Sequence, residues 1–282
     1  MSMLGKTALV TGANSGTGLW TAIGLAKKGA RVVMLCRSKE RGEEALKEVK
    51  KLSHNDQVDL MLCDLGSFES IRSFSKEFHD RYDVLDILVN NAGVTLPKRE
   101  ETKDGFELQF GVNHLGHFLL TNLLLDLIKK SKSARIVVVS SGAHKAGKIH
   151  FEDLQLKKSF NMIKAYSQSK LANLLFAYEL SHRLKDGNIT VNALHPGAVA
   201  SNMGINRDTG FGKFVTKKLK PFFQTPEEGA STSMYLATAE ELEGITGKYY
   251  YQMKPIESSK QSYNRSLQKK LWQISEVLVG LK

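Results

Sequence analysis

Short runs of apolar residues alternate along the chain with longer stretches in which apolar positions recur at helical spacing. Continuous apolar runs of this length indicate strands that are buried on both faces, and the longer stretches indicate amphipathic helices. Strands are predicted at residues 7–10, 31–36, 58–63, 85–89, 135–140 and 190–194. Helices are expected at about residues 16–28, 38–51, 67–82, 105–130 and 162–185, followed by a helix over 226–238, a strand over 247–251 and a helix over about 262–281.

This alternation predicts an α/β fold with a single doubly wound parallel sheet, a Rossmann fold, and helices on both faces. The 282 residues are enough for one large core, so one domain over residues 1–282 is expected. In such sheets ligands bind beyond the carboxyl ends of the strands. Chemically active side chains are therefore expected directly after the strands.

Three glycines lie between the first predicted strand and the first predicted helix. The segment reads Thr11-Gly12-Ala13-Asn14-Ser15-Gly16-Thr17-Gly18, with the spacing G-x-x-x-G-x-G. Glycines at these places let the backbone turn tightly and approach a pyrophosphate, and the helix N-terminus adds unpaired N–H groups and a positive dipole end. The position between strand and helix favours a nucleotide site over a glycine-rich turn without a ligand.

The end of the second predicted strand distinguishes NAD from NADP. An acidic residue about 20 positions beyond the glycines would bind the ribose 2′-hydroxyl of NAD. Arg37 stands in that region instead, and its planar set of donors suits a 2′-phosphate. Lys39 or Arg41 could add positive charge. The segment favours NADP(H), although Arg37 alone would also fit a solvent-facing residue at the start of a helix.

Tyr166 and Lys170 lie four residues apart in a predicted helix, so their side chains share one face. The ordinary pKa of tyrosine, about 10, is too high for a base at neutral pH, and a nearby ammonium and a positive nicotinamide ring are expected to lower it. By spacing alone the pair also fits a helix surface. Ser140 and Ser141 end the fifth predicted strand, however, and in a parallel sheet they can meet the Tyr166 helix at one edge.

Together these motifs resemble the short-chain dehydrogenase/reductase family over nearly the whole chain. Asp64-Leu65, Asn90-Asn91-Ala92-Gly93 and Pro196-Gly197 follow the third, fourth and sixth strands, where the family contacts adenine, ribose and nicotinamide. Segments 113–118, 169–173 and 247–250 look most like its retinol dehydrogenase and protochlorophyllide reductase-like branch. Thr17 departs from the pattern, because the family usually carries isoleucine or leucine there, and this could alter nucleotide affinity.

The resemblance implies an oxidoreductase that transfers a hydride between NADP(H) and a small-molecule carbonyl or alcohol. It implies a tetrad in which Tyr166 moves the proton beside Lys170, Ser141 rather than Ser140 binds the substrate oxygen, and Asn113 helps to hold a water that links the lysine to solvent. Cofactor contacts are implied for Gly12, Asn14, Ser15, Gly16, Thr17, Gly18, Arg37, Lys39, Arg41, Asp64, Leu65, Asn91, Ala92, Gly93, Tyr166, Lys170, Pro196, Gly197 and Val199.

Residues 198–225 interrupt the alternation and are expected to form a flap over the site. Within them, residues 210–223 combine aromatic side chains with four lysines. This composition fits a pocket wall for an apolar substrate, with the lysines facing water or anionic lipid, and it fits an ordinary amphipathic lid equally well. Together with the resemblance, it suggests a lipophilic substrate that is similar to a retinoid, a steroid or a lipid aldehyde.

The net charge of +11 has two alternative explanations, attraction to a polyanion or a plain lysine-rich surface. Because the basic residues are spread along the chain, no nucleic-acid partner is expected. The chain shows no apolar run of transmembrane length and no signal-peptide core near residue 1. Cys36 and Cys63 are expected to be buried free thiols. A cytoplasmic protein is expected, with peripheral membrane contact and a homodimer as further expectations.

His114 and His117 lie three residues apart and could suggest a metal site. No carboxylate or cysteine cluster joins them in the sequence, so they are interpreted as packing residues and no metal is expected. Two other functions stay open at this point. One is a nucleotide-binding regulator without catalysis, against which intact Ser141, Tyr166 and Lys170 argue; the other is a protein that binds membrane surfaces or nucleic acid through its charge.

Overall fold

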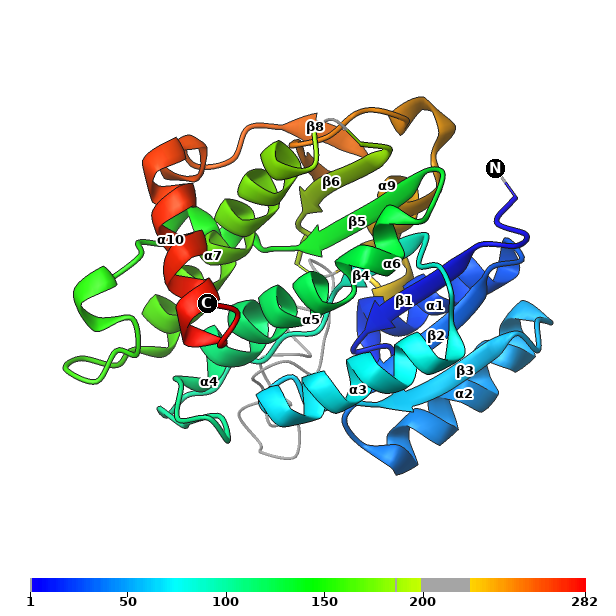
Figure 1. Ribbon diagram of the computed structural model, residues 1–282, viewed down its shortest axis with the longest axis horizontal. Helices are drawn as coiled ribbons and strands as arrows, with labels where there is room; N and C mark the ends of the chain where they lie inside the picture. Colours follow the sequence, from blue (N-terminus) through cyan, green and yellow to red (C-terminus); the bar gives the residue numbers. More distant parts are fainter. Residues whose placement is uncertain (1, 186, 199–223) are drawn as a thin grey trace.

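A computed structural model describes residues 2–185, 187–198 and 224–282. Its eight strands form one sheet in the order β3-β2-β1-β4-β5-β6-β7-β8 (Figure 1). Neighbouring strands are parallel except β7 and β8. The predicted doubly wound parallel sheet is therefore confirmed. The strands are β1 (Thr7–Thr11), β2 (Arg31–Cys36), β3 (Val58–Leu62), β4 (Ile87–Asn90), β5 (Ala134–Val139), β6 (Ile189–Leu194), β7 (Tyr249–Tyr251) and β8 (Lys254–Ile256).

The strand order reverses between β1 and β4. From β1 the chain builds outward through β2 to β3, and it then returns to place β4 on the other side of β1. In a doubly wound sheet this reversal leaves a crevice beyond the carboxyl ends of the two central strands, and ligands bind there. The glycine-rich turn that follows β1 and the Asn91–Gly93 segment that follows β4 both lie at this point.

Helices cover both faces of the sheet (Figure 1). Side chains of α3, α5 and α7 join one hydrophobic core, and those of α1, α2 and α9 join the core on the opposite face. The helices are α1 (Gly16–Lys27), α2 (Lys39–Ser53), α3 (Phe68–Arg81), α4 (Leu108–Phe110), α5 (His117–Leu123), α6 (Leu125–Lys129), α7 (Met162–Arg183), α9 (Pro226–Thr238) and α10 (Arg265–Leu278).

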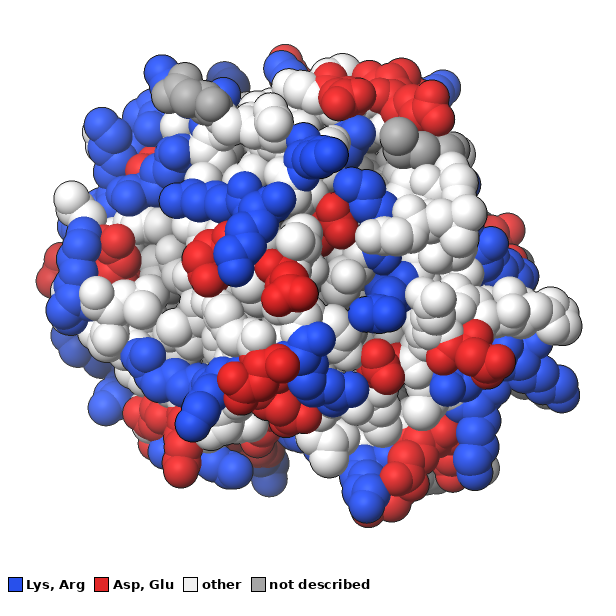
Figure 2. Space-filling model, turned by 45° about the vertical axis from the view of Figure 1, so that its right-hand side comes forward, with Lys and Arg blue, Asp and Glu red and all other residues white. Residues whose placement is uncertain are grey.

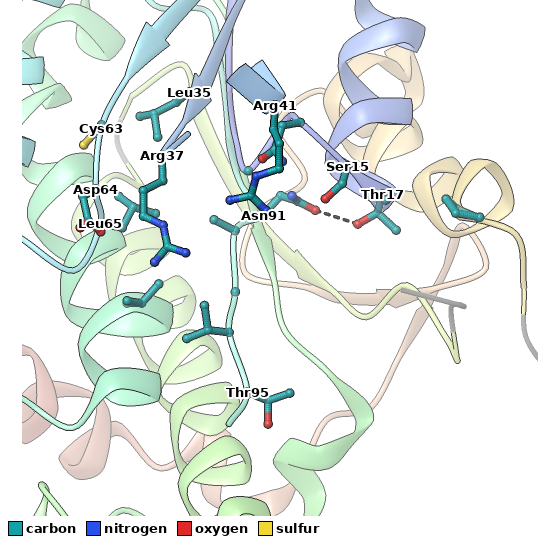
Figure 3. Close-up of a pocket in the computed structure, with 18 of the residues that line it drawn as sticks. Ser15, Thr17, Leu35, Arg37, Arg41, Cys63, Asp64, Leu65, Asn91 and Thr95 are labelled. Atoms are coloured by element: carbon teal, nitrogen blue, oxygen red, sulfur yellow. Dashed lines mark hydrogen bonds between the residues drawn. The ribbon is translucent and has the colours of Figure 1, made fainter. Parts of the chain in front are cut away.

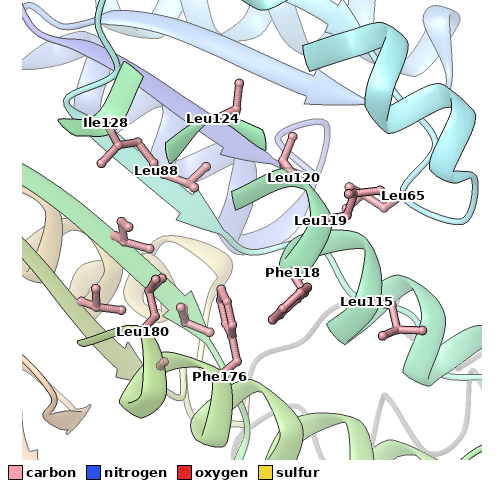
Figure 4. Close-up of a cluster of buried hydrophobic side chains, with 14 of the residues drawn as sticks. Leu65, Leu88, Leu115, Phe118, Leu119, Leu120, Leu124, Ile128, Phe176 and Leu180 are labelled. Atoms are coloured by element: carbon pink, nitrogen blue, oxygen red, sulfur yellow. The ribbon is translucent and has the colours of Figure 1, made fainter. Parts of the chain in front are cut away.

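Alternate residues of each strand supply the two cores, because successive side chains of a strand point to opposite faces. In β1, Leu9 belongs to the α3–α5–α7 side, whereas Ala8 and Val10 belong to the α1–α2–α9 side. On the first side Phe118 of α5 and Phe176 of α7 lie with ring centroids 5.6 Å apart (Figure 4). The continuous apolar runs of the sequence thus correspond to strands that are covered on both faces.

Side chains cap the N-termini of several of the predicted helices. Ser38 caps α2 by accepting a hydrogen bond from the main-chain N–H of Arg41. Asn161 caps α7 in the same way, and Thr225 forms a capping box with Glu228 at the start of α9. These caps explain why α7 and α9 begin where the sequence pattern predicted them.

The predicted continuous helix over residues 105–130 is wrong. The segment divides into α4, a π-helical turn η1 (Gly111–Gly116), α5 and α6. Glycines at both ends of η1 allow the chain to approach its neighbours, because a Cβ at Gly111 would collide with the Thr102 side chain and one at Gly116 with the Leu65 carbonyl. Such π-helical turns interrupt the regular hydrogen bonding of a helix and recur at functional sites. This one carries Asn113.

The C-terminal helix α10 packs against α7 and α5. Its Trp272 ring stacks on Phe176 of α7, with centroids 5.9 Å apart, and meets Phe118 edge-on at 4.8 Å. His114 is buried beneath it and hydrogen-bonds Ser275 Oγ through Nε2 at 2.8 Å. Burial lowers the pKa of His114 to about 3, so this ring is neutral. His114 therefore packs between helices.

The antiparallel strand β8 was not predicted. It pairs with β7 across a tight turn in which Gln252 and Met253 adopt left-handed conformations, with φ of 49° and 60°. Gly or Asn usually signals such a turn in a sequence, and neither is present here.

Cys36 and Cys63 are buried free thiols, as predicted. In the described part of the chain no helix combines the length and the apolar character needed to cross a bilayer. That one domain covers residues 1–282 stays a prediction.

The basic residues do not form a single patch on the face shown in Figure 2. Lysine and arginine side chains there are interspersed with aspartate and glutamate. Surface ion pairs occur in the described residues, for example between Arg99 and Glu101 at 2.8 Å. On this face the excess positive charge is therefore partly compensated locally.

Candidate active site

A cavity of about 570 Å³ opens at the carboxyl ends of β1, β2, β3 and β4 (Figure 3). It lies where the strand order reverses, as the fold requires of a ligand site. Twelve of the residues predicted to contact a cofactor line it together: Gly12, Asn14, Ser15, Gly16, Thr17, Arg37, Arg41, Asp64, Leu65, Asn91, Ala92 and Gly93.

Seven further residues line the cavity, and sequence reasoning did not predict them. Five of them lie within three residues of predicted positions at strand ends, so the strand ends themselves were the available signal. Pro226, at the start of α9, had no such local signal, because it reaches the cavity only through the packing of α9 on α1. The seven are Leu35, Cys63, Val94, Thr95, Leu96, Val112 and Pro226.

The glycine-rich turn leaves the N-terminus of α1 free for an anion. Gly12 and Gly16 have positive φ of 66° and 57°, which a side chain would disfavour. Ser15 occupies the N-cap position without a side-chain capping bond, and the first turn of α1 has no acidic residue. The main-chain N–H groups and the positive end of the helix dipole are thus available to a phosphate group.

Gly18 serves this turn in a different way from the other glycines. It does not appear among the described residues that line the cavity. A Cβ on Gly18 would collide with the Asn91 side chain and the Gly12 carbonyl, so glycine is needed for close packing behind the turn. The structure therefore places Gly18 as a support of the predicted site.

A hydrogen bond joins the glycine-rich turn to the segment after β4. Thr17 Oγ1 donates to Asn91 Oδ1 at 2.8 Å (Figure 3). Asn91 Nδ2 in turn donates to the Thr11 carbonyl at 2.8 Å. Thr17 is the residue that departs from the family pattern, and its hydroxyl provides a polar bridge that isoleucine or leucine could not form.

Arg37 and Arg41 reach into the cavity from the end of β2 and the first turn of α2 (Figure 3). In the described residues neither guanidinium forms an ion pair, so both are available to an anion. Arg37 directly precedes the N-cap Ser38, and Arg41 lies in the first turn of the helix. Lys39, between them, is instead 3.9 Å from Glu43 at the surface. The structure does not bring Lys39 to the cavity.

Tyr166 and Lys170 share one face of α7, as predicted. Lys170 Nζ lies 5.6 Å from the centroid of the Tyr166 ring. The lysine is almost wholly buried, with 2% of its surface exposed, and in the described residues its ammonium donates to one acceptor, the Val139 carbonyl at 3.3 Å. An ammonium has three N–H donors, so two remain for other groups. Burial lowers the pKa of Lys170 to about 8.

The expected lowering of the Tyr166 pKa is not found in the protein alone. Burial raises the pKa of Tyr166, and the hydrogen bond from the Ser141 side chain only partly opposes this. The physical reason is that desolvation disfavours the phenolate, while the Lys170 ammonium lies toward the ring and is itself costly to bury. The phenol is therefore protonated at neutral pH.

Ser141 is held in place from two directions. Its Oγ accepts a hydrogen bond from Ala143 N at 3.2 Å, and its carbonyl accepts one from His144 Nδ1 at 2.6 Å. His144 Nε2 accepts from Ser259 N at 3.1 Å, so the C-terminal segment supports the turn. Ser140 differs, because its hydroxyl donates to the Lys170 carbonyl at 2.8 Å and is buried. The Ser140 hydroxyl is thus engaged within the protein, and the choice of Ser141 stays a prediction.

Asn113 connects the cavity wall to the helix of Tyr166. Its Oδ1 accepts from Val94 N at 2.7 Å, and its Nδ2 donates to Val94 O and to Ser169 Oγ, both at 3.0 Å. Ser169 Oγ donates to the Tyr166 carbonyl at 2.8 Å. Val94 lines the cavity, so a short series of hydrogen bonds leads from the predicted cofactor site to the predicted proton donor.

The segment after β6 is described only in part. Gly197 has a φ of 86°, and a Cβ there would lie 2.7 Å from Gln224 Oε1. His195 accepts or donates a hydrogen bond with the Tyr249 hydroxyl at 2.7 Å, and burial lowers the pKa of His195 to about 4. Pro196 and Gly197 are not among the described residues that line the cavity. Val199 and residues 199–223 of the predicted flap lie outside the described residues.

The described residues fit a nicotinamide dinucleotide. The free helix N-terminus suits the pyrophosphate, the unpaired arginines suit further negative charge, and the buried ammonium of Lys170 has donors to spare. No group of three or more histidine, cysteine, aspartate or glutamate side chains among the described residues could hold a metal ion.

The chain is similar to known proteins over most of its length. The model of the short chain dehydrogenase family matches residues 6–210. Retinol dehydrogenase 14 of Homo sapiens is 46% identical over 300 residues, which cover 99% of this chain and 88% of that protein. Retinol dehydrogenase 13 of Homo sapiens is 44% identical, over 99% of this chain and 86% of that protein.

Solved structures agree with these relatives. An uncharacterized protein from Mycobacterium paratuberculosis has a TM-score of 0.79 at 33% identity, over 99% of this chain and 95% of that chain. The RhlG/NADP active-site complex of Pseudomonas aeruginosa has a TM-score of 0.69 at 26% identity, over 88% and 94% of the two chains. The chain therefore belongs to the short-chain dehydrogenase family of nicotinamide-dependent oxidoreductases, in its retinol dehydrogenase-like branch.

Proposed function

We propose that this protein is an NADP(H)-dependent oxidoreductase that interconverts a carbonyl and an alcohol, with Tyr166 as the proton donor in reduction. The observation that carries this proposal is the placement of a protonated phenol, hydrogen-bonded to Ser141, beside the buried ammonium of Lys170. Asn113 ties this group to the wall of the nucleotide cavity through Val94 and Ser169.

The preference for NADP(H) rests on the two arginines in the cavity wall. The ribose 2′-phosphate carries negative charge, which Arg37 and Arg41 can meet because neither guanidinium forms an ion pair with a carboxylate among the described residues. A carboxylate at position 37 would repel that phosphate and accept from a 2′-hydroxyl instead. The RhlG structure is a complex with NADP, which agrees with this assignment at the level of the family.

When bound, the nicotinamide ring supplies the hydride for reduction or receives it in oxidation. Tyr166 Oη holds a proton at neutral pH, because burial raises its pKa, and it donates that proton to the substrate oxygen. The Ser141 hydroxyl stabilises the negative charge that develops on the same oxygen. The Lys170 ammonium then stabilises the phenolate left on Tyr166 until a proton returns from solvent. Oxidation of an alcohol uses the same groups in reverse.

The substrate is proposed to be lipophilic, similar to a retinoid, a steroid or a lipid aldehyde. The names of the retinol dehydrogenase relatives support this class. We propose reduction as the main direction, because cellular NADP pools are kept largely reduced. A cytoplasmic location, peripheral membrane contact and a homodimer stay predictions.

Steady-state kinetics test this proposal. NADPH and NADH oxidation is followed with a panel containing all-trans-retinal, a steroid ketone, a medium-chain aldehyde and a small polar ketone. We expect turnover with at least one lipophilic carbonyl and a kcat/KM at least about tenfold higher with NADPH, which corresponds to about 1.4 kcal/mol. Equal or better turnover with NADH, or no turnover with any carbonyl or corresponding alcohol, would contradict the proposal.

A further inference from the structure

His117 is a buried residue that the proposed chemistry does not use. It begins α5, with Nε2 placed 2.9 Å from Thr11 Oγ1 and Nδ1 placed 3.1 Å from the Asn113 carbonyl oxygen. Thr11 ends β1 at the start of the glycine-rich turn, and Asn113 lies in the π-helical turn. The imidazole therefore stands between the cofactor side of the sheet and the residue that connects to α7.

The Thr11 hydroxyl determines which nitrogen of His117 carries the proton. The main-chain N–H groups of Asn91 and Ala92 both donate to Thr11 Oγ1 at 2.9 Å. These two bonds fill the lone pairs of the hydroxyl, so it donates its own hydrogen. His117 Nε2 at 2.9 Å is a nearer acceptor than the Val89 carbonyl at 3.3 Å. Nε2 therefore accepts, and Nδ1 is protonated.

The contact with Asn113 leads independently to the same tautomer. A carbonyl oxygen can only accept, so Nδ1 donates to it. The ring is also neutral, because burial and the nearby Lys170 ammonium lower the pKa of His117 to about 4. A protonated ring would place an N–H against Thr11 Oγ1, which has no lone pair left. His117 is thus held as one neutral tautomer at physiological pH.

Asn113 passes this constraint on to α7. Its side chain donates to Ser169 Oγ at 3.0 Å, and Ser169 Oγ donates to the Tyr166 carbonyl at 2.8 Å. Thr11 donates to His117 and His117 donates to Asn113. Asn113 in turn donates to Ser169, which donates to Tyr166. The first two bonds end on the main chain of Asn113 and the last two start from its side chain, so they act together by fixing the position of this one residue.

We propose that His117 is a positioning residue: its neutral Nδ1–H tautomer fixes the Asn113 carbonyl and thereby sets the π-helical turn that couples the nucleotide cavity to the helix of Tyr166. The turn needs such a constraint, because π-helical hydrogen bonding is irregular and glycines at its two ends loosen the backbone. The inference rests on the proposed function, since only catalysis makes the placement of Tyr166 important.

Two amide substitutions separate the two ends of the imidazole. In H117N the side-chain amide stays near the position of Nδ1 and can still donate to the Asn113 carbonyl. In H117Q the amide reaches the position of Nε2, so the Asn113 carbonyl loses its donor. In both variants the Thr11 hydroxyl can still donate its hydrogen, because the Val89 carbonyl lies 3.3 Å away as an alternative acceptor.

The kinetic test uses the full chain with NADPH and the best carbonyl of the panel. We expect H117N to keep kcat within about threefold of wild type and H117Q to lose roughly tenfold or more, because small displacements of reacting groups are costly. KM for NADPH should stay within about threefold in both. Equal kcat values for H117Q and wild type, or equal losses in H117N and H117Q, would overturn the proposal and leave His117 a packing residue.

A spectroscopic test does not depend on turnover. Nitrogen-15 NMR of histidine-labelled wild-type protein without cofactor should show His117 as the neutral Nδ1–H tautomer from pH 5 to pH 9. In addition, the amide resonances of Ser169 and Tyr166 should shift in H117Q and much less in H117N. An Nε2–H tautomer, a titration near pH 6.5 or equal shifts in both variants would overturn the inference. Absence of turnover in wild-type protein, with these spectra as expected, would instead contradict the proposed function.

Discussion

The Lys170 ammonium lies 5.6 Å from the centroid of the Tyr166 ring, on the same face of α7, and both side chains are largely removed from water. Burial shifts the pKa values of the two groups in opposite directions. It raises the pKa of Tyr166 and lowers that of Lys170 to about 8, so each is pushed toward its neutral form. Burial thus keeps the phenol protonated and places a desolvated ammonium beside it, as the proposed role of Tyr166 as proton donor requires.

The buried ammonium predicts a pH-dependent cost in stability. Because the pKa of Lys170 falls from 10.5 to about 8 on folding, the folded state binds this proton more weakly than the unfolded chain. The cost is fully present below pH 8 and disappears as the pH rises to about 10.5. We expect K170M to raise the free energy of unfolding at pH 7 by about 3 kcal/mol while abolishing turnover.

Urea unfolding of the cofactor-free protein at pH 7 and pH 10 measures this effect. The stability advantage of K170M over wild type should shrink at the higher pH. K164M is the matched control, since Lys164 lies in the first turn of the same helix and its ammonium hydrogen-bonds Ser159 at the surface. A K170M protein that is less stable than wild type at pH 7 would show that the ammonium is not held at this cost.

Arg37→Asp tests the assignment of the 2′-phosphate. The substitution replaces a cation in the cavity wall by a carboxylate, which repels a phosphate and can accept from a 2′-hydroxyl. We expect the ratio of kcat/KM for NADPH to that for NADH to fall by about 100-fold, because a charge-assisted hydrogen bond and a repulsion both contribute. Arg31→Asp, at the exposed opposite end of β2, should leave the ratio unchanged. An unaltered ratio in the Arg37 variant would remove the assignment.

Much of this site could be predicted because it depends on local rules. Residues that follow parallel strands meet at one edge of the sheet, so the glycine-rich turn, Arg37 and Asn91 come together as the pattern indicated. Helical spacing likewise places Tyr166 and Lys170 on one face. These relationships follow from the periodicity of strands and helices and need no knowledge of distant contacts.

Other features depend on contacts between distant segments, which local patterns do not contain. The π-helical turn depends on how Gly116 meets Leu65, and the support of His144 comes from Ser259 near the end of the chain. In the protein alone the Tyr166 pKa also moves opposite to the expected direction, for a similar reason. Spacing shows that an ammonium is near, but the cost of burial is known only from the packed structure.

Thr17→Val should weaken the cofactor site of this chain. Valine has nearly the same shape but cannot donate to Asn91 Oδ1, so an amide oxygen beside the glycine-rich turn loses its partner. The expected loss is about 1 kcal/mol, which is about fivefold in the dissociation constant of NADPH measured by fluorescence titration. Thr17→Ser keeps the hydroxyl and should bind as wild type does. Identical affinities for all three proteins would mean that the bridge does not organise the site.

Alanine at Ser140 and at Ser141 should have distinct effects. Ser141→Ala removes the hydroxyl that hydrogen-bonds the phenol and is proposed to bind the substrate oxygen, so kcat should fall by about 100-fold or more with little change in the free energy of unfolding. Ser140→Ala removes a buried bond to the Lys170 carbonyl and should cost about 1 kcal/mol of stability while most turnover remains. Both variants are compared by kcat and by urea unfolding. A large loss of kcat in Ser140→Ala with little loss in Ser141→Ala would exchange the roles of the two serines.

Tyr166→Phe tests the central claim most directly, because it removes a single oxygen and keeps the ring that packs beside Lys170. NADPH binding is measured by fluorescence titration, and single-turnover oxidation of bound NADPH is followed with the best carbonyl of the panel. The account predicts a dissociation constant within about threefold of wild type and a rate of hydride transfer lowered by at least about 1000-fold, since proton donation and its alignment are both lost. Hydride transfer at the wild-type rate would contradict it.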